Sequence, residues 1–229
     1  MIMIIIVPGW ILFCILLSGV LLTGLLMQWF GGFFITRDVL VRNFTILDLE
    51  LASTEKEIDN TLKGIVQLEP AVAGKVIRSL TYHLYMDFLF MPAAYGTIFV
   101  ACLNVAWKMP TSGAIFFTVM GWLQVASWVS DILENIYLLG KINRIKSEYT
   151  PSFMSFHTYQ YLEVVKWGLA LLAIVCLLSA LMYFWISGLY MEISLKYLLA
   201  VMIELTIFVL LMKWIKNTGE RWKATHTFK

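Results

Sequence analysis

The sequence contains few charged residues. Asp, Glu, Lys and Arg make up only 14% of its 229 residues, whereas 60% are hydrophobic and the mean hydropathy is +0.80. A soluble domain of this length must expose a substantial share of its residues to water, so this composition excludes an ordinary soluble protein. The formal net charge of +2 is too small to indicate nucleic-acid binding. The composition is typical of a multi-pass integral membrane protein.

Recognisable chemical motifs are also scarce. The three cysteines, Cys14, Cys102 and Cys176, lie in apolar runs without CxxC spacing, which favours small core residues over a metal or redox site. No HExxH, Glu-x-x-His, Walker loop or paired-Asp phosphotransferase motif is present. The sequence therefore leaves open whether the protein is an enzyme.

Long apolar runs predict an all-α fold, a polytopic bundle of five transmembrane helices within a single membrane domain, 1–229. A helix needs about 20 residues to cross the hydrocarbon core. The N-terminal run lacks the basic region and cleavage site of a signal peptide, so we expect it to be a retained helix. Tryptophans bracket two of the spans at separations of about 27–29 Å, close to the core thickness. The expected spans are 9–30, 84–106, 114–138, 165–187 and 195–215.

Lysine and arginine indicate the orientation. They concentrate in the cytosolic segment predicted at 36–83, after the third span, and in the tail 216–229, whereas the opposite side has little beyond Lys108 and Lys196. The positive-inside rule then predicts an N-terminus outside and a C-terminus inside the cell membrane, or the inner membrane of a bacterium.

The segment 36–83 contains an amphipathic helix signal. Thr54 and Glu57 have capping-box spacing, and Ile58, Leu62 and Ile65 follow at helical intervals. We expect a short helix lying on the membrane or on the bundle. Pro70 fits the first position of a further helix that runs straight into the second span.

Polar residues form a stripe on the third span. Helical spacing puts them on one face, which should turn toward protein or a water-filled cavity. Their depth is the cytosolic half of the span. These residues are Gln124, Ser127, Asp131, Glu134 and Asn135.

Two neighbouring spans bring polar residues to the same depth. His83 and Asp87 are four residues apart in the second span and are expected to pair, with Tyr82, Tyr85 and Tyr95 nearby and a helix kink at Pro92. The fourth span contributes Glu163 and Lys166. The sequence thus predicts an acidic, cytosol-facing cavity between three helices.

The carboxylates need a counterion or a shared proton. Each costs roughly 2.5–3.5 kcal/mol at a helix centre, and less near the interface. A divalent metal is one candidate, with His83, Asp87, Asp131 and Glu134 as ligands. The alternatives are structural pairing of these carboxylates with Lys166, His83 or tyrosine hydroxyls, and snorkelling of the carboxylates to the membrane interface. Glu204 in the fifth span is either a helix-packing residue or a member of a proton relay.

Three functional classes follow. The first is a membrane protein that binds a cation or a polar lipid head group at this cavity. Such a protein could also be a lipid-modifying enzyme. The second is a small proton- or cation-coupled transporter that uses Glu204. The third is a structural or accessory subunit of a membrane complex.

Overall fold

A computed structural model describes residues 9–37, 41–146, 154–189 and 192–227. It contains five helices that are long and apolar enough to cross a membrane, which confirms the helical bundle expected from the sequence. All but the first extend well beyond the 20 residues that a bilayer core requires. They are α1 (Gly9–Gly31), α4 (Pro70–Ala106), α5 (Thr111–Lys146), α6 (Phe156–Ile186) and α7 (Glu192–Thr227).

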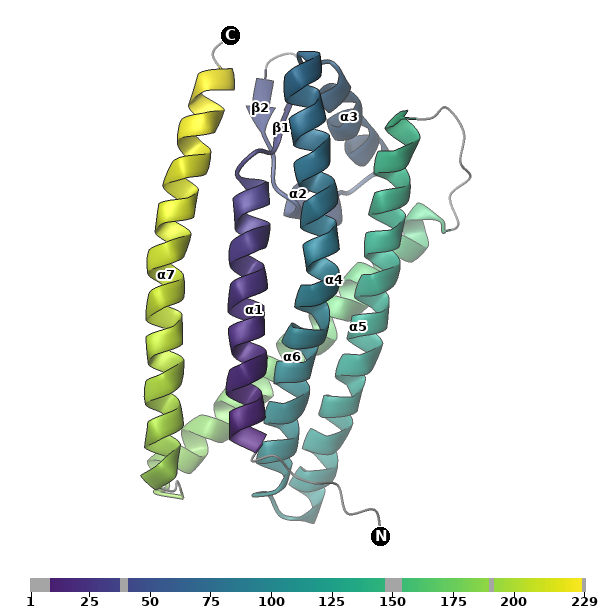
Figure 1. Cartoon of the computed structure of the whole chain (residues 1–229). Coiled ribbons are helices and arrows are strands. Elements are labelled where there is room, and N and C mark those ends of the chain that lie inside the picture. The colour runs from purple at the N-terminus through teal and green to yellow at the C-terminus, as the bar shows by residue number, and fades with distance from the viewer. Residues whose placement is uncertain (1–8, 38–40, 147–153, 190–191, 228–229) are drawn as a thin grey trace.

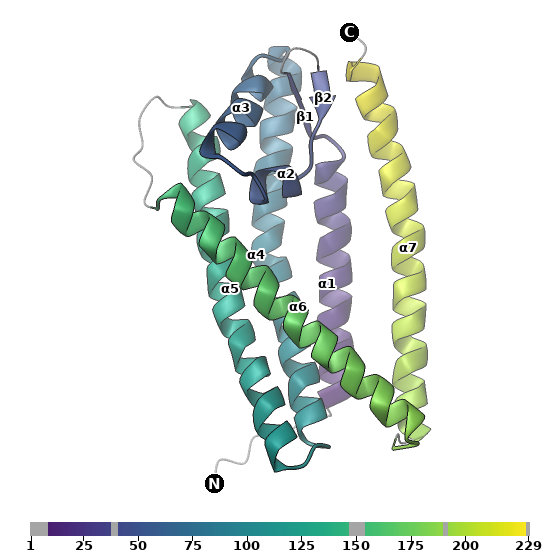
Figure 2. The ribbon, with the colours of Figure 1, turned by 180° about the vertical axis from the view of Figure 1, so that it is seen from behind.

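The long helices form an elongated bundle (Figure 1). α1, α4 and α5 lie side by side, and α7 packs against the other side of α1. α6 crosses one face of this row obliquely, from the end of α5 to the start of α7, and lies in the foreground of Figure 2. Consecutive long helices run in alternating directions, so α1 begins at one end of the bundle and α7 finishes at the other.

The segment between α1 and α4 forms a compact cap at the end where α1 finishes (Figures 1 and 2). It consists of β1 (Ile35–Arg37), β2 (Val41–Asn43), α2 (Leu47–Glu50) and α3 (Glu55–Val66). The two strands pair antiparallel, with Thr36 opposite Arg42. This small hairpin departs from the purely helical expectation, because three-residue strands leave no usable alternation in a sequence.

The amphipathic helix lies on the bundle. Ile58, Leu62 and Ile65 of α3 are buried in the main core together with Leu80 of α4 and Ile142 of α5. Burying this apolar face is what attaches the cap to the long helices.

The expected capping box forms only in part. Thr54 is the N-cap residue of α3, but its side chain makes no capping hydrogen bond. Glu57 does reach back, where it accepts a hydrogen bond from the backbone N–H of Ser53 at 2.8 Å. The expected start at Pro70 is confirmed, and α4 continues through Pro92 to Ala106. α7 likewise continues through most of the predicted tail.

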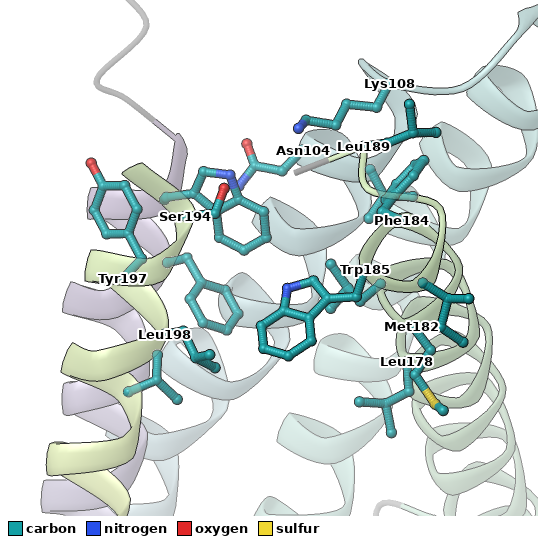
Figure 3. Close-up of a pocket in the computed structure, with 16 residues that line it drawn as sticks. Asn104, Lys108, Leu178, Met182, Phe184, Trp185, Leu189, Ser194, Tyr197 and Leu198 are labelled. Atoms are coloured by element: carbon teal, nitrogen blue, oxygen red, sulfur yellow. The ribbon is translucent and has the colours of Figure 1, made fainter. Parts of the chain in front are cut away.

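A cavity of about 510 Å³ lies at the opposite end of the bundle from the cap (Figure 3). Its walls come from the beginning of α1, the C-terminal end of α4, the end of α6 and the beginning of α7. It is distinct from the polar residues predicted as a site.

Substitution of Gly64 can test the close contact between α3 and β1 in the cap. A Cβ atom at this position of α3 would collide with the backbone oxygen of Arg37 and the hydroxyl of Thr36. We expect Gly64→Ala to lower the free energy of unfolding by about 1–3 kcal/mol, the usual penalty for overpacking. Gly74→Ala is the matched control, because a Cβ there meets nothing within 4 Å. Chemical unfolding in detergent measures both, and equal stabilities would contradict the close approach of α3 to β1.

Candidate functional site

All nine residues predicted for the polar cavity are buried in the structure, each less than a tenth exposed. They come from α4, α5 and α6, so neither Asp87 nor Asp131 faces the lipid side of its helix. The nine are His83, Asp87, Gln124, Ser127, Asp131, Glu134, Asn135, Glu163 and Lys166. Burial of this many polar groups is expected only where they satisfy one another or a ligand.

Lys166 is the centre of this arrangement. Its ammonium lies 2.5 Å from Glu134 Oε2, 3.0 Å from Glu163 Oε2 and 3.2 Å from Asp131 Oδ1. Glu163 and Lys166 are one turn apart on α6, whereas Asp131 and Glu134 are one turn apart on α5. Lys166 of α6 therefore joins the two helices through two carboxylates of α5 and pairs with a third on its own helix.

A further carboxylate comes from the cap and was missed by sequence reasoning. Glu50 of α2 reaches toward Lys166, with Oε2 4.0 Å from the ammonium and 11% of the side chain exposed. The hydroxyl of Tyr159 donates to the backbone oxygens of Leu49 and Glu50 at 3.0 and 3.3 Å, which fixes α2 above the site. The one signal was the run Ile46–Leu51, where acidic and apolar residues alternate. That run is too short to show which face is buried.

A second branch of hydrogen bonds extends to α4. The amide of Asn135 donates to Asp87 Oδ2 at 2.6 Å, and the hydroxyl of Tyr95 donates to Asp131 Oδ2 at 2.9 Å. Tyr95 therefore belongs to the site, whereas Tyr82 and Tyr85 are about half exposed. We use "acidic cluster" for the carboxyl groups around Lys166 and this branch: Glu50, Asp87, Asp131, Glu134 and Glu163.

His83 does not form the expected pair with Asp87. Its Nδ1 donates to the backbone oxygen of Met27 at 2.9 Å, which assigns the proton of the neutral ring to Nδ1. Its ring packs against Phe34, and Nε2 has no hydrogen-bond partner among the described residues. The carbonyl of α1, rather than the carboxylate one turn away, therefore sets the orientation of this histidine.

Three other predicted residues have packing contacts of their own. The Gln124 amide donates to the backbone oxygens of Met120 and Leu169, and the Ser127 hydroxyl donates to Leu123 within its own helix. Glu204 accepts a hydrogen bond from Ser18 of α1 at 3.0 Å. α7 packs on α1, whereas the acidic cluster lies on α2, α4, α5 and α6. No described contact joins Glu204 to the cluster.

Negative charge exceeds positive charge in the acidic cluster. Four carboxyl groups lie within 4.0 Å of the one ammonium, and Asp87 adds a fifth through the Asn135 branch. Oε1 of Glu134 and Oδ1 of Asn135 are buried without a hydrogen-bond partner among the described residues. Fully ionised, such a set would be strongly unfavourable, because buried charges require matched partners. The cluster must therefore hold additional protons or an additional cation.

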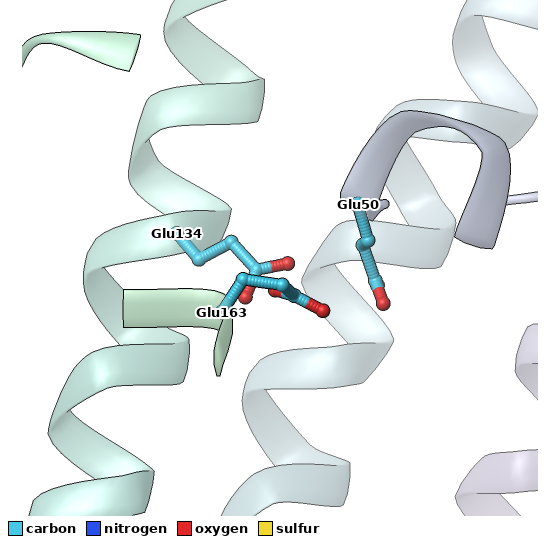
Figure 4. A group of neighbouring side chains, drawn as sticks. All are labelled: Glu50, Glu134 and Glu163. Atoms are coloured by element: carbon cyan, nitrogen blue, oxygen red, sulfur yellow. The ribbon is translucent and has the colours of Figure 1, made fainter. Parts of the chain in front are cut away.

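Three members of the cluster converge closely enough to share an ion. Glu50, Glu134 and Glu163 each offer an oxygen, and these atoms all lie within 4.8 Å of one another. Figure 4 shows the carboxyl groups of Glu134 and Glu163 directed toward Glu50. Of the metal ligands expected from the sequence, only Glu134 belongs to this group. Asp131 is linked to it through Lys166, whereas Asp87 and His83 contact Asn135 and Met27 instead.

No protein-family model, curated protein or solved structure matches this chain.

Lys166 should be essential for stability. Lys166→Met leaves buried carboxylates without their cation, and we expect a loss of about 3–5 kcal/mol in the free energy of unfolding. Lys141→Met is a matched control. This buried lysine pairs with Glu55 and Asp59, whose side chains are 48% and 39% exposed and would stay hydrated. Unfolding in detergent compares the two, and equal losses would mean that the cluster is neutral without Lys166.

The buried Glu50 carboxyl should make the stability of the fold depend on pH. Burial raises the pKa of the Glu50 carboxyl from 4.5 to about 8. The Lys166 ammonium opposes this shift, and Glu163, Asp87 and Asp131 add to it. Since the folded pKa is the higher one, the stability linked to Glu50 is present below about pH 4.5 and is lost as pH rises through about 8.

Glu50→Gln should therefore flatten the decline in thermal stability between these pH values. Asp48→Asn, on the exposed side of the same helix, should retain the wild-type slope. Parallel profiles for wild type and Glu50→Gln would show that Glu50 does not titrate in this range.

Proposed function

We propose that the chain is a multi-pass integral membrane protein, a single membrane domain whose cap and acidic cluster face the cytosol. The cap end of the bundle carries most of the lysines and arginines, from the cap itself, the start of α4, the end of α5 and the end of α7. The other end has Lys108 and Lys196. This asymmetry supports an N-terminus outside and a C-terminus inside under the positive-inside rule.

The function that the geometry supports best is binding of a divalent cation in the acidic cluster. The main support is that Glu50, Glu134 and Glu163, from three separate elements, each offer an oxygen, and these oxygens lie within 4.8 Å of one another. Hard cations take carboxylate oxygens as ligands, and the unpartnered Oε1 of Glu134 is a ligand atom without another use. A bound dication would also neutralise the charge that Lys166 leaves uncompensated.

The spread of the three ligand oxygens, up to 4.8 Å, favours a larger ion. Ca²⁺ binds oxygens at about 2.3–2.6 Å, so two ligands on opposite sides of it stand up to about 5 Å apart. Mg²⁺, with bonds of about 2.0–2.1 Å and strict octahedral geometry, requires a tighter set. We therefore expect Ca²⁺ to bind better than Mg²⁺, and Mn²⁺, which takes the same oxygen ligands, can serve as a probe of the site.

Lys166 acts as the built-in counterion of this site. Its ammonium contacts Glu134 and Glu163, two of the three proposed ligands. An incoming ion shares these carboxylates with the ammonium, which limits affinity and makes binding reversible. Neither transport nor lipid modification has support of this kind. Glu204 accepts a hydrogen bond from Ser18 of α1, and no described contact joins it to the acidic cluster.

Cation binding can be measured on the purified protein in nanodiscs of zwitterionic lipid. Electron paramagnetic resonance of Mn²⁺, with Ca²⁺ as competitor, should show one saturable site. Glu134→Gln and Glu163→Gln each remove a ligand charge but keep the side-chain volume, and each should weaken binding at least tenfold.

Asp59→Asn is the matched control, since it removes a carboxylate of the cap that pairs with Lys141 outside the cluster. It should bind Mn²⁺ as the wild type does. The absence of saturable binding to the wild type, or equal binding by all of these folded variants, would refute the proposal.

A further inference from the structure

We propose that the cavity at the end opposite the cap binds one phospholipid with an anionic head group. This site is separate from the acidic cluster and involves different parts of the helices. Its walls combine α1, α4, α6 and α7, and its volume is about 510 Å³. This volume falls in the range of about 300–1,000 Å³ typical of ligand pockets.

The cavity is amphiphilic along its length. Lys108, Asn104, Ser194 and Tyr197 gather toward one end, whereas Trp185, Met182, Leu178 and Leu198 line the remainder (Figure 3). The polar end comes from the end of α4 and the start of α7, where these helices reach the edge of the bundle. A ligand that fits must therefore carry a polar head at the edge and an apolar chain directed inward.

The positive charge of Lys108 indicates which kind of lipid head group the cavity binds. Lys108 is the charged residue of the described lining, and no carboxylate lines the cavity with it. No ion pair joins Lys108 to another described side chain. An ammonium donates charge-assisted hydrogen bonds to phosphate oxygens, so Lys108 favours a phosphate-bearing head with net negative charge.

Asn104 offers a second donor at the polar end. Its Nδ2 is buried and has no hydrogen-bond partner among the described residues. The side chain lies against Gly9, where a Cβ atom would collide with Oδ1. Gly9 thus leaves room for the Asn104 side chain between α1 and α4, and a rotation of this amide turns the unpartnered Nδ2 toward a phosphate oxygen in the cavity.

The apolar part suits an acyl chain. Lipid tails are as apolar as leucine, and no other apolar molecule is as abundant in a bilayer. Trp10 and Trp185 are part of the lining, and tryptophan favours the membrane interface. These residues place the polar end of the cavity at head-group depth, where a phospholipid presents its phosphate.

Native mass spectrometry of the purified full chain, titrated with phosphatidylglycerol or phosphatidylcholine, tests the proposal. We expect one bound phosphatidylglycerol that survives detergent removal, and at least tenfold weaker binding of phosphatidylcholine. Lys108→Gln should weaken phosphatidylglycerol binding at least tenfold and leave phosphatidylcholine unchanged.

A matched pair of tryptophan substitutions locates the lipid. Leu198→Trp fills the cavity and should abolish the bound phosphatidylglycerol. Leu199→Trp adds the same side chain at the adjacent position, which is 63% exposed and outside the lining, and should leave binding intact. Equal binding by the two folded variants would place the lipid elsewhere and overturn the proposal. Equal affinity of the wild type for both lipids would overturn the anionic head group.

Discussion

The ion-pair network around Lys166 is the interaction on which the packing of this bundle depends. Its ammonium holds Asp131 and Glu134 of α5 beside Glu163 of α6. In a membrane, helices gain little by burying apolar faces against one another, because lipid is equally apolar. A charged network therefore selects one arrangement of α5 and α6, since any other would leave charges in hydrocarbon. Hydrogen bonds from Tyr95 and Asn135 extend the same selection to α4.

The cap completes this network rather than merely joining two helices. α3 buries an apolar face on α4 and α5, and Tyr159 of α6 holds α2 through its backbone. These contacts bring Glu50 over Lys166 and close the site on the side of the cap. The same contacts exclude water from the acidic cluster. Because Glu50 adds a carboxyl group to this buried site, the cluster needs a further proton or cation to balance its charge. Stability of the cap and chemistry of the cluster are thus coupled.

The two ends of the bundle differ in chemistry. The cap end concentrates buried carboxylates, whereas the far end has an apolar cavity with a single lysine at its rim. The oblique course of α6 produces both features (Figure 2). Near its start α6 lies against α5 and contributes Glu163 and Lys166. Near its end it lies beside α7 and forms a wall of the cavity.

Local patterns in the sequence were enough to specify the five long apolar helices, the amphipathic α3 and the polar face of α5. Each follows from hydropathy or helical period within one segment, and period alone places Asp131 and Glu134 together. Membrane depth also offered Lys166 as a partner of these two carboxylates, and it does pair with both, but other contacts of the site could not be read in this way. Glu50 comes from a four-residue helix without periodicity, and His83 turns to a carbonyl of α1 rather than to Asp87. The far cavity could not be predicted from the sequence either. Its walls come from four helices, and no single segment of sequence records how far apart these helices lie. Period along a helix determines which face is polar, but only the packing of helices decides which faces meet.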